Sequence, residues 1–147
     1  MIIRSMTIAD YDGVYALWLA TPGMGLNDVD DSREGIEKYL RRNPNTCFVA
    51  EKDSEIIGVI LSGHDGRRGF IYHMAVAISE RKNGIATALL DRAMDALDRE
   101  GIAAVMLIVI KNNKLGNKFW KSRGFNKRPD LVFRSKYIRE INYLNQS

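Results

Sequence analysis

Apolar positions in the first half of the chain follow two different periods. From Tyr11 to Trp18 they recur at the three- and four-residue spacing of a helix, and Thr7 with Asp10 predicts a capping box just before it. A second helix is expected after Ser32, ending before Asn43-Pro44. Three short runs rich in β-branched and aromatic residues follow, over 47–50, 56–61 and 70–76, with turn residues between them. With an opening strand over 2–4, the pattern predicts an antiparallel group of strands that carries two helices.

The second half of the chain alternates helices and strands. The pattern predicts a helix over about 84–99, a buried strand over 103–110, a short helix over 114–123 and a last strand over 131–137. The predicted order is β-α-α-β-β-β-α-β-α-β, which indicates a single α/β domain over residues 1–147. Short turns between the middle strands force antiparallel pairing, so we expect a mixed sheet, not a doubly wound parallel one.

The amino-acid composition excludes several classes of protein. With 3 Pro and 12 Gly in 147 residues, the chain is neither collagen-like nor low-complexity. A single cysteine excludes a disulfide within the chain and a cysteine zinc cage, and with only two histidines we expect no metal site. No apolar stretch is long enough to span a membrane, and the N-terminus lacks the apolar core of a signal peptide. We therefore expect a cytoplasmic protein that makes no membrane contact.

Charge is distributed unevenly along the chain. The formal net charge is +4, but residues 111–139 hold ten basic residues and one acid, so they carry +9 and the remaining residues −5. This asymmetry indicates an anionic partner for the C-terminal third, either a nucleic acid or a phosphorylated small molecule. A solvated basic surface without a partner explains the same pattern.

One strand-to-helix junction carries the strongest chemical signal. After the strand that ends near Val76 come the cations Arg81 and Lys82, and then the small residues Gly84 and Ala86 at the start of a helix. The free N–H groups and positive dipole end of a helix start favour an anion, and small side chains let a phosphate approach the backbone. The loop is neither a Walker A motif nor a G-x-G-x-x-G fingerprint. From the residues alone, an ordinary helix cap remains equally consistent.

Two motifs resemble those of the GCN5-related N-acetyltransferases (GNAT). The run over 81–86, RKNGIA, resembles motif A of that family, written Arg/Gln-x-x-Gly-x-Gly/Ala. The run over 113–125, NKLGNKFWKSRGF, resembles motif B, written N-x-x-A-x-x-F-Y-x-x-x-G-F. The predicted element order also resembles the whole GNAT fold. The chain is thus identified as a small stand-alone member of this family.

The resemblance implies a fold and a cofactor. It implies a mixed, mostly antiparallel sheet in which two neighbouring parallel strands splay apart, and acetyl-CoA bound with its pantetheine arm in the gap. The basic C-terminal third would then meet the phosphates of CoA. The residues that the resemblance assigns to the cofactor are Met74, Val76, Arg81, Lys82, Asn83, Gly84, Ile85, Ala86, Thr87, Asn113 and Trp120.

The chain departs from the family at the position of the general acid. Motif B has a tyrosine after its phenylalanine, and this chain has Trp120 there. An indole N–H donates a hydrogen bond but cannot deliver a proton near neutral pH. A thiol has a pKa of about 8.5, so a CoA thiolate leaves without full protonation. The catalytic role of that position therefore does not carry over to this chain.

The alternation of side chains along the strand over 70–76 predicts which of them face the acceptor. In the family register, Phe70 and Tyr72 lie on the acceptor side, whereas His73 is expected to point away. Tyr72 is the candidate catalytic residue, as a proton relay through water, or it only lines the pocket. In the loop between the first two helices, Asp28 and Asp30 are candidates to attract a cationic amine. A solvated acidic loop is the alternative.

The sequence therefore predicts an N-acetyltransferase. It would move acetyl from acetyl-CoA to a primary amine, on a small molecule or a protein N-terminus, by direct attack in a ternary complex. One alternative is a CoA-binding sensor of the same fold that does not turn over, which Trp120 favours. Another is an RNA-associated protein that uses the basic third, but no RNA-binding motif is present, so no nucleic-acid partner is expected. The oligomeric state, homodimer included, stays open.

Overall fold

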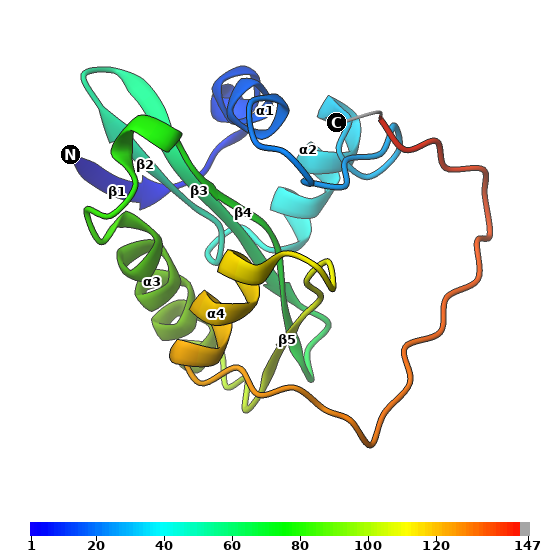
Figure 1. The fold of residues 1–147 in the computed structure, drawn as a ribbon. Helices are drawn as coiled ribbons and strands as arrows, with labels where there is room; N and C mark the ends of the chain where they lie inside the picture. Colours follow the sequence, from blue (N-terminus) through cyan, green and yellow to red (C-terminus); the bar gives the residue numbers. More distant parts are fainter. Residues whose placement is uncertain (145–147) are drawn as a thin grey trace.

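A five-stranded sheet forms the centre of the molecule in the computed structural model, which describes residues 1–144 (Figure 1). The strands are β1 (Ile2–Ser5), β2 (Phe48–Lys52), β3 (Glu55–His64), β4 (Gly69–Val76) and β5 (Val105–Leu107). They lie in the order β1-β2-β3-β4-β5. The pairs from β1 to β4 are antiparallel, and β4 pairs with β5 in parallel. The mixed, mostly antiparallel sheet predicted from the sequence is thus confirmed.

Helices cover both faces of this sheet. They are α1 (Tyr11–Leu19), α2 (Arg33–Arg42), α3 (Ile85–Arg99) and α4 (Lys114–Ser122), with short 3-10 turns η1 (Ile8–Asp10) and η2 (Ile78–Glu80). One buried cluster packs α1 and α2 against the sheet, and Trp18 at its centre is fully buried. A second cluster packs α3 against the opposite face, with Phe119 and Trp120 of α4 at its margin. No helix among residues 1–144 is long and apolar enough to cross a membrane.

Local sequence signals place the helix starts as expected. Thr7 and Asp10 form a capping box at η1, where the Asp10 carboxylate accepts the Thr7 N–H at 2.9 Å. Arg4 donates two further hydrogen bonds to the same carboxylate, at 2.7 and 2.9 Å. Ser32 caps α2 by accepting the Gly35 N–H at 3.0 Å. These caps fix the starts of η1 and α2, and α1 and α2 cover one face of the sheet.

A β-bulge in β4 changes which residues face which side. Val59 pairs with Ala75 and Leu61 with Tyr72. The chain therefore advances by three residues in β4 where it advances by two in β3, which is a bulge of one extra residue. The extra residue is His73, whose φ of 47° lies in the left-handed region. Its carbonyl oxygen accepts a hydrogen bond of 2.9 Å from the indole nitrogen of Trp18. The expectation that His73 points away from the acceptor side is therefore wrong, because simple alternation stops at the bulge.

The parallel strands part after a short contact. β4 and β5 pair only from Gly69 to Ile71 and from Val105 to Leu107. Beyond that point both segments continue in the same direction without pairing, which gives the splayed pair that the family resemblance implied. The strand predicted over 103–110 is correspondingly shortened to three residues.

The last predicted strand does not form. Residues 131–137 have no strand or helix partner, and the chain from 126 to 140 is exposed at every position. In Figure 1 this segment, orange to red, leaves the end of α4, runs beside the body and returns near the start of α2. Its β-branched and aromatic residues predict a strand, but a strand needs a neighbouring edge, and this chain places none beside it.

Candidate functional site

The pocket of interest opens where β4 and β5 separate. It has a volume of about 670 Å³. Its walls are the loop before α2, one face of α2, the bulged part of β4, the segment after β5, and the inner side of α4. Its lining includes Asp30, Asp31, Tyr39, Phe70, Tyr72, His73, Met74, Ile108, Ile110, Asn113, Trp120 and Tyr143.

The start of α3 suits an anionic group. Gly84 is the cap residue, with a φ of 76°, and it offers no side chain to the free N–H groups of the first turn. The first intrahelical bond runs from Ala88 N to Gly84 O, so the amides of Ile85, Ala86 and Thr87 lack a helical partner. A Cβ atom on Gly84 would meet nothing within 4 Å, so the backbone there lies open.

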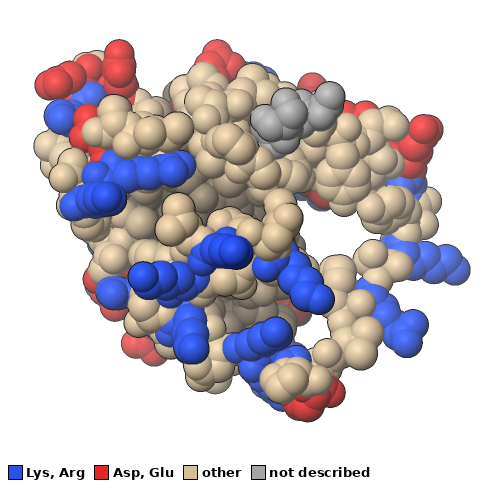
Figure 2. Space-filling view, in the orientation of Figure 1, with Lys and Arg blue, Asp and Glu red and all other residues tan. Residues whose placement is uncertain are grey.

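Cations surround this helix start. Lys82 also has a positive φ, 69°, and the Arg81 Nε donates a hydrogen bond of 3.2 Å to the Val76 carbonyl oxygen. On α4, Lys114, Lys118 and Lys121 recur at helical spacing. Figure 2 shows Lys and Arg side chains gathered over this part of the molecule. The residues present therefore fit a polyphosphate group such as that of CoA.

The two candidates from α4 take defined positions. The Asn113 side chain accepts the Gly116 N–H at 2.9 Å and so caps α4, while the residue also lines the pocket. Trp120 lines the pocket and packs edge-on between Phe119 and Phe125, with ring centroids 5.1 and 5.2 Å away. Trp120 thus forms part of the wall at the position where the family has its tyrosine.

Aromatic rings line the opposite wall. Phe70 and Tyr72 lie together on β4 with ring centroids 4.6 Å apart, and Tyr39 of α2 meets Tyr72 edge-on at 5.9 Å. Burial, and then the negative charge of Asp30, raise the pKa of Tyr72 above its ordinary value. The phenol therefore keeps its proton at neutral pH, which argues against a role as a base.

A histidine–carboxylate pair lies beside these rings. His73 Nε2 and Asp31 Oδ1 are 3.0 Å apart, and the side chain of His73 is 17% exposed. Asp31 is buried at 3% exposure, and its other oxygen accepts the Asn27 N–H at 2.9 Å. Because an ionised carboxylate only accepts hydrogen bonds, Nε2 carries the hydrogen and Nδ1 is left as a proton acceptor. The bulge brings this group to the pocket.

The acidic loop divides into two parts. Asp30 lines the pocket, as expected, and accepts a bond from the Asn27 side chain at 3.1 Å. Asp28 does not line it. Its carboxylate accepts the N–H and the side-chain amide of Asn142, at 2.8 and 3.0 Å, and so holds the returning C-terminal segment. The structure therefore does not bring Asp28 together with Asp30 at the pocket, although the sequence suggested both as groups that attract the acceptor.

Sequence reasoning does not single out three residues of this site. Alternation favours a structural role for His73 over a catalytic one, and no local signal indicates the bulge that turns its side chain to the other face. Asp31 belongs to the acidic loop but is distinguished from its neighbours only by its burial. Tyr39 follows the apolar period of α2, and its hydroxyl is buried without a hydrogen-bond partner among the described residues. Only the packing of α2 over β4 brings these three side chains together.

Proteins similar to this chain indicate its family. The family model described as "Acetyltransferase (GNAT) family" matches residues 11–125. A curated relative, acetyltransferase plu1384 of Photorhabdus laumondii, is 35% identical over 117 residues, which cover 77% of this chain and 78% of the relative. The family model's match spans the loop before α3, the bulged strand β4 and α4.

Solved structures share the fold at lower identity. Ard1 from Thermoplasma volcanium superposes with a TM-score of 0.74 at 21% identity, covering 84% of this chain and 80% of its own. The PaiA N-acetyltransferase from Thermoplasma acidophilum, solved in complex with coenzyme A, gives a TM-score of 0.72 at 19% identity, covering 85% and 89%.

Proposed function

Since this chain belongs to the GNAT acetyltransferase family and takes acetyl-CoA as its acetyl donor, we propose that it acetylates a primary amine. The acceptor would be a small molecule or a protein N-terminus, and the amine would attack directly in a ternary complex. The observation that carries the proposal is the His73–Asp31 pair, placed beside an acidic and aromatic wall.

The acceptor wall favours a cation. The carboxylates of Asp30 and Asp31 supply negative charge, and the rings of Phe70 and Tyr72 present faces on which an ammonium group is stabilised. An amine reaches the enzyme mostly in its ammonium form. The groups that attract the ammonium would therefore also hold it beside the His73–Asp31 pair. An alcohol acceptor would gain nothing from this arrangement.

Attack requires that the ammonium lose a proton first. We assign this to Nδ1 of His73, with Asp31 holding the ring in the correct tautomer through Nε2. The Trp18 indole fixes the backbone at His73, so the ring is oriented from both sides. Tyr72 then lines the pocket, and its role as a proton relay, expected from the sequence, becomes the alternative that the experiment tests.

Acetyl-CoA supplies an activated thioester when it is bound. The contribution of this chain's own residues is to bind acetyl-CoA. The amides of Ile85, Ala86 and Thr87 and the cations around them would bind the pyrophosphate, and the separated backbone at Met74 would take the pantetheine arm. Trp120 closes the wall without donating a proton, because a thiolate of pKa about 8.5 leaves unaided.

The test is acetyl transfer against a panel of amines, with CoA release as the readout. For the best acceptor, His73→Asn should lower kcat by about 10²–10⁴-fold while the affinity for acetyl-CoA stays unchanged. Tyr72→Phe should change kcat by less than about threefold, which is about 0.7 kcal/mol. A large loss in Tyr72→Phe with little in His73→Asn would assign the proton transfer to Tyr72.

The same panel separates the enzyme from a sensor. If acetyl-CoA binds but no amine in a broad panel is acetylated at any pH, the protein is a CoA-binding sensor and the proposal fails. If an amine is acetylated, kcat/KM should rise with pH through the range in which the acceptor ammonium loses its proton.

A further inference from the structure

A second cavity adjoins the pocket at the splayed strands. Its volume is about 410 Å³, and it lies toward the start of β4, between the end of α2 and the turn that joins β3 to β4. The residues that line both cavities are Tyr39, Arg42, Phe70 and Tyr72. The two cavities therefore form one continuous groove along β4, termed here the acceptor groove.

Two arginine side chains lie at the end of the groove that the second cavity forms. Arg42 comes from the last turn of α2, and Arg68 from the turn before β4. Among residues 1–144, the Arg42 guanidinium forms no ion pair or hydrogen bond, and that of Arg68 bonds only the Arg67 carbonyl oxygen, at 3.4 Å. A guanidinium is always charged, and its planar set of N–H donors matches a carboxylate or a phosphate. Both groups are therefore available to an anionic ligand.

The backbone that carries both arginines is held in place. The Asn43 side chain accepts the His64 N–H at 2.9 Å, which joins the end of α2 to the end of β3. In the turn that follows, Asp65 Oδ1 accepts the N–H groups of Arg67 and Arg68 at 2.8 and 2.9 Å. Because these bonds fix the points from which the two guanidinium groups extend, less conformational freedom is lost when they bind a ligand.

The net charge at this end of the groove is positive. Among the described residues, Asp65 is the one acid that lines the second cavity. The N–H groups of Arg68 and Arg67, and then the charge of Arg42, hold the pKa of Asp65 below its ordinary value. Asp65 thus stays ionised and offsets one of the two guanidinium charges. Lys38, one helical turn before Arg42, lines the neighbouring pocket and adds a further cation.

The other end of the groove carries the acidic groups. Asp30 and the His73–Asp31 pair line it there. Four positions of β4 separate Gly69 from His73. At about 3.3 Å per residue, and with a small shortening by the bulge, they place the two ends roughly 10 Å apart. The groove therefore offers a negative site and a positive site at a defined separation.

We propose that the acceptor carries an acidic group about 10 Å from its amine, and that Arg42 and Arg68 bind this group. The inference rests on the proposed function, because it places the acceptor amine at His73. Three extended residues span about 10 Å, so a peptide fits the groove, with its N-terminal amine at His73 and its carboxylate between the arginines. Phe70 and Tyr72 then line the stretch between the two charged groups.

The same charges select against other amines. A polyamine or an aminoglycoside places a second cation where the arginines lie, and like charges brought together in this way weaken binding. An amine without an acidic group gains nothing from the arginines. The carboxylate has two sources, the C-terminus of a short peptide or an acidic side chain near the start of a longer chain, and the experiments below distinguish them.

Peptide binding to the CoA-loaded protein tests the site without any turnover. Tripeptides X-Ala-Ala, with glycine, serine or methionine as X, are compared with their C-terminal amides, which present the same amine without the carboxylate. In calorimetric titrations, at least one free acid should bind about tenfold more tightly than its amide, as expected for charge-assisted hydrogen bonds, and added salt should reduce the difference. Equal affinity within every pair, or no binding of any tripeptide, overturns the proposal.

Variants at the arginines test which residues bind the carboxylate. Arg42→Gln/Arg68→Gln should bind the free acid and the amide with affinities within about twofold of each other. Arg41→Gln/Arg67→Gln removes the same charge from the same helix and turn, but neither residue is among the described residues that line the groove. This control should keep the preference for the acid. If the first variant keeps that preference, or if the control loses it, the assignment is overturned.

Charge reversal gives a readout that a purely structural role would not produce. Arg42→Glu/Arg68→Glu should prefer an amidated tripeptide with lysine as its third residue over the free acid that the wild type prefers. Circular dichroism and thermal melts should show that the variant is folded. A folded variant that still binds the acid more tightly than the lysine peptide contradicts the proposal.

Turnover identifies the source of the acid and separates this proposal from the proposed function. With hexapeptides amidated at the C-terminus, glutamate in place of glutamine at the third or fourth residue should lower KM and leave kcat within about twofold if a side chain supplies the carboxylate. A preference seen only with free tripeptides assigns it to the C-terminus. If the acids bind preferentially but no amine is acetylated, the proposed function fails and the site stands. If amines are acetylated and no acidic group changes KM, the proposed function stands and the site is overturned.

Discussion

At the scale of single residues, Asp10 combines the most interactions on the α1 side. Burial by itself would raise the pKa of Asp10, but hydrogen bonds from Arg4 and Thr7 lower it below its usual value. A carboxyl group whose pKa is depressed on folding stabilises the native state above its unfolded pKa of about 3.9. This stability is lost as the pH falls through the lower, folded value.

Asp10→Asn should therefore reduce the free energy of unfolding by about 1–2 kcal/mol at pH 7. The difference from wild type should shrink as the pH falls below about 4, where Asp10 is protonated in the unfolded chain. Urea denaturation across this pH range measures it. Asp12→Asn is the control, because Asp12 pairs with Arg33 at 87% exposure, and its loss should cost under about 0.5 kcal/mol. Equal losses in both variants would contradict the role given to Asp10.

Trp120 offers a second prediction at this scale. If the residue only forms the wall, Trp120→Phe should keep kcat within about threefold, and kcat/KM should show no falling limb near pH 10, the ordinary pKa of a phenol. Initial rates from neutral to alkaline pH provide the measurement. A loss of more than about tenfold, or about 1.4 kcal/mol, would mean that the indole takes part in the reaction.

At the scale of elements, the two ends of α3 provide a matched pair of glycines. Gly84 and Gly101 have φ of 76° and 79°, and a Cβ atom on either meets nothing within 4 Å. A side chain at either position therefore costs about 1–2 kcal/mol in backbone strain, without a clash in this structure. The two glycines differ in their neighbours. Gly84 precedes the free amides that would hold the pyrophosphate, whereas Gly101 follows the other end of the helix.

Gly84→Leu should weaken CoA binding by at least about tenfold, because the side chain occupies the space of the phosphates, while Gly101→Leu leaves the affinity unchanged. Calorimetric titration with CoA gives the affinities, and thermal melts should show that both variants lose similar stability. Unchanged affinity in a folded Gly84→Leu protein would refute the pyrophosphate assignment.

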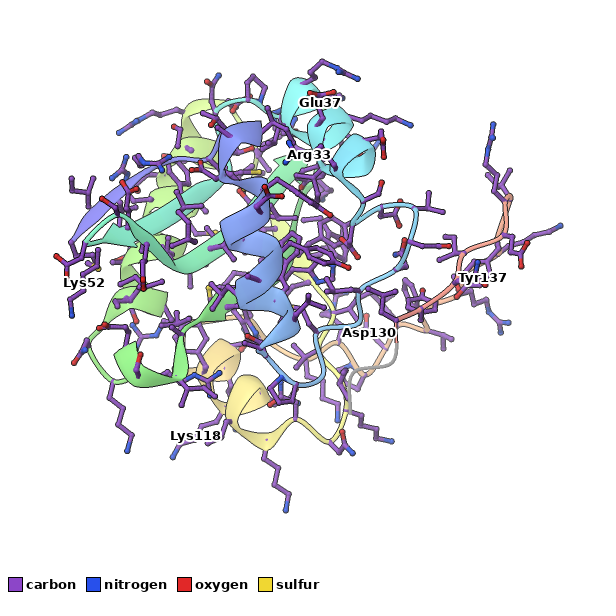
Figure 3. The ribbon with its side chains drawn as sticks, turned by 90° about the horizontal axis from the view of Figure 1, so that it is seen from above. Arg33, Glu37, Lys52, Lys118, Asp130 and Tyr137 are labelled. Atoms are coloured by element: carbon purple, nitrogen blue, oxygen red, sulfur yellow. The ribbon has the colours of Figure 1, made fainter. Side chains whose placement is uncertain are left out.

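At the scale of the whole molecule, charge separates an acidic body from a basic C-terminal third. Lys118 of α4 points outward from its helix, away from the sheet (Figure 3). The family resemblance places the 3′-phosphate of CoA near this helix. A long-range attraction of this kind is screened by salt, so its strength should depend on ionic strength.

Lys118→Glu should weaken CoA binding several-fold and dephospho-CoA binding much less, and added salt should reduce the difference. Arg67→Glu, on the exposed turn between β3 and β4, changes net charge equally and should leave both affinities alone. Should CoA and dephospho-CoA bind the wild type alike, while RNA binds with a steep salt dependence, the basic third serves a nucleic acid instead.

The sequence by itself determined the features that depend only on residues a few positions apart. The capping box at Thr7 and Asp10, the Ser32 cap and the helix start at Gly84 all lie where the sequence predicts them. Each depends on bonds between residues no more than four apart, so the sequence carries the whole signal. The two motifs likewise identify the family, because their residues are adjacent in the chain.

Tertiary structure alone decided which polar side chains line the pocket. His73 faces the pocket because an extra residue in β4 turns it, and partners 42 and 55 positions away, Asp31 and Trp18, bond its ring and its carbonyl oxygen. The run over 131–137 has the composition of a strand but forms none, since pairing needs an edge that this chain does not place beside it. A bulge and a strand pairing are both set by distant neighbours, and a linear pattern of residues contains no information on which neighbours will be there.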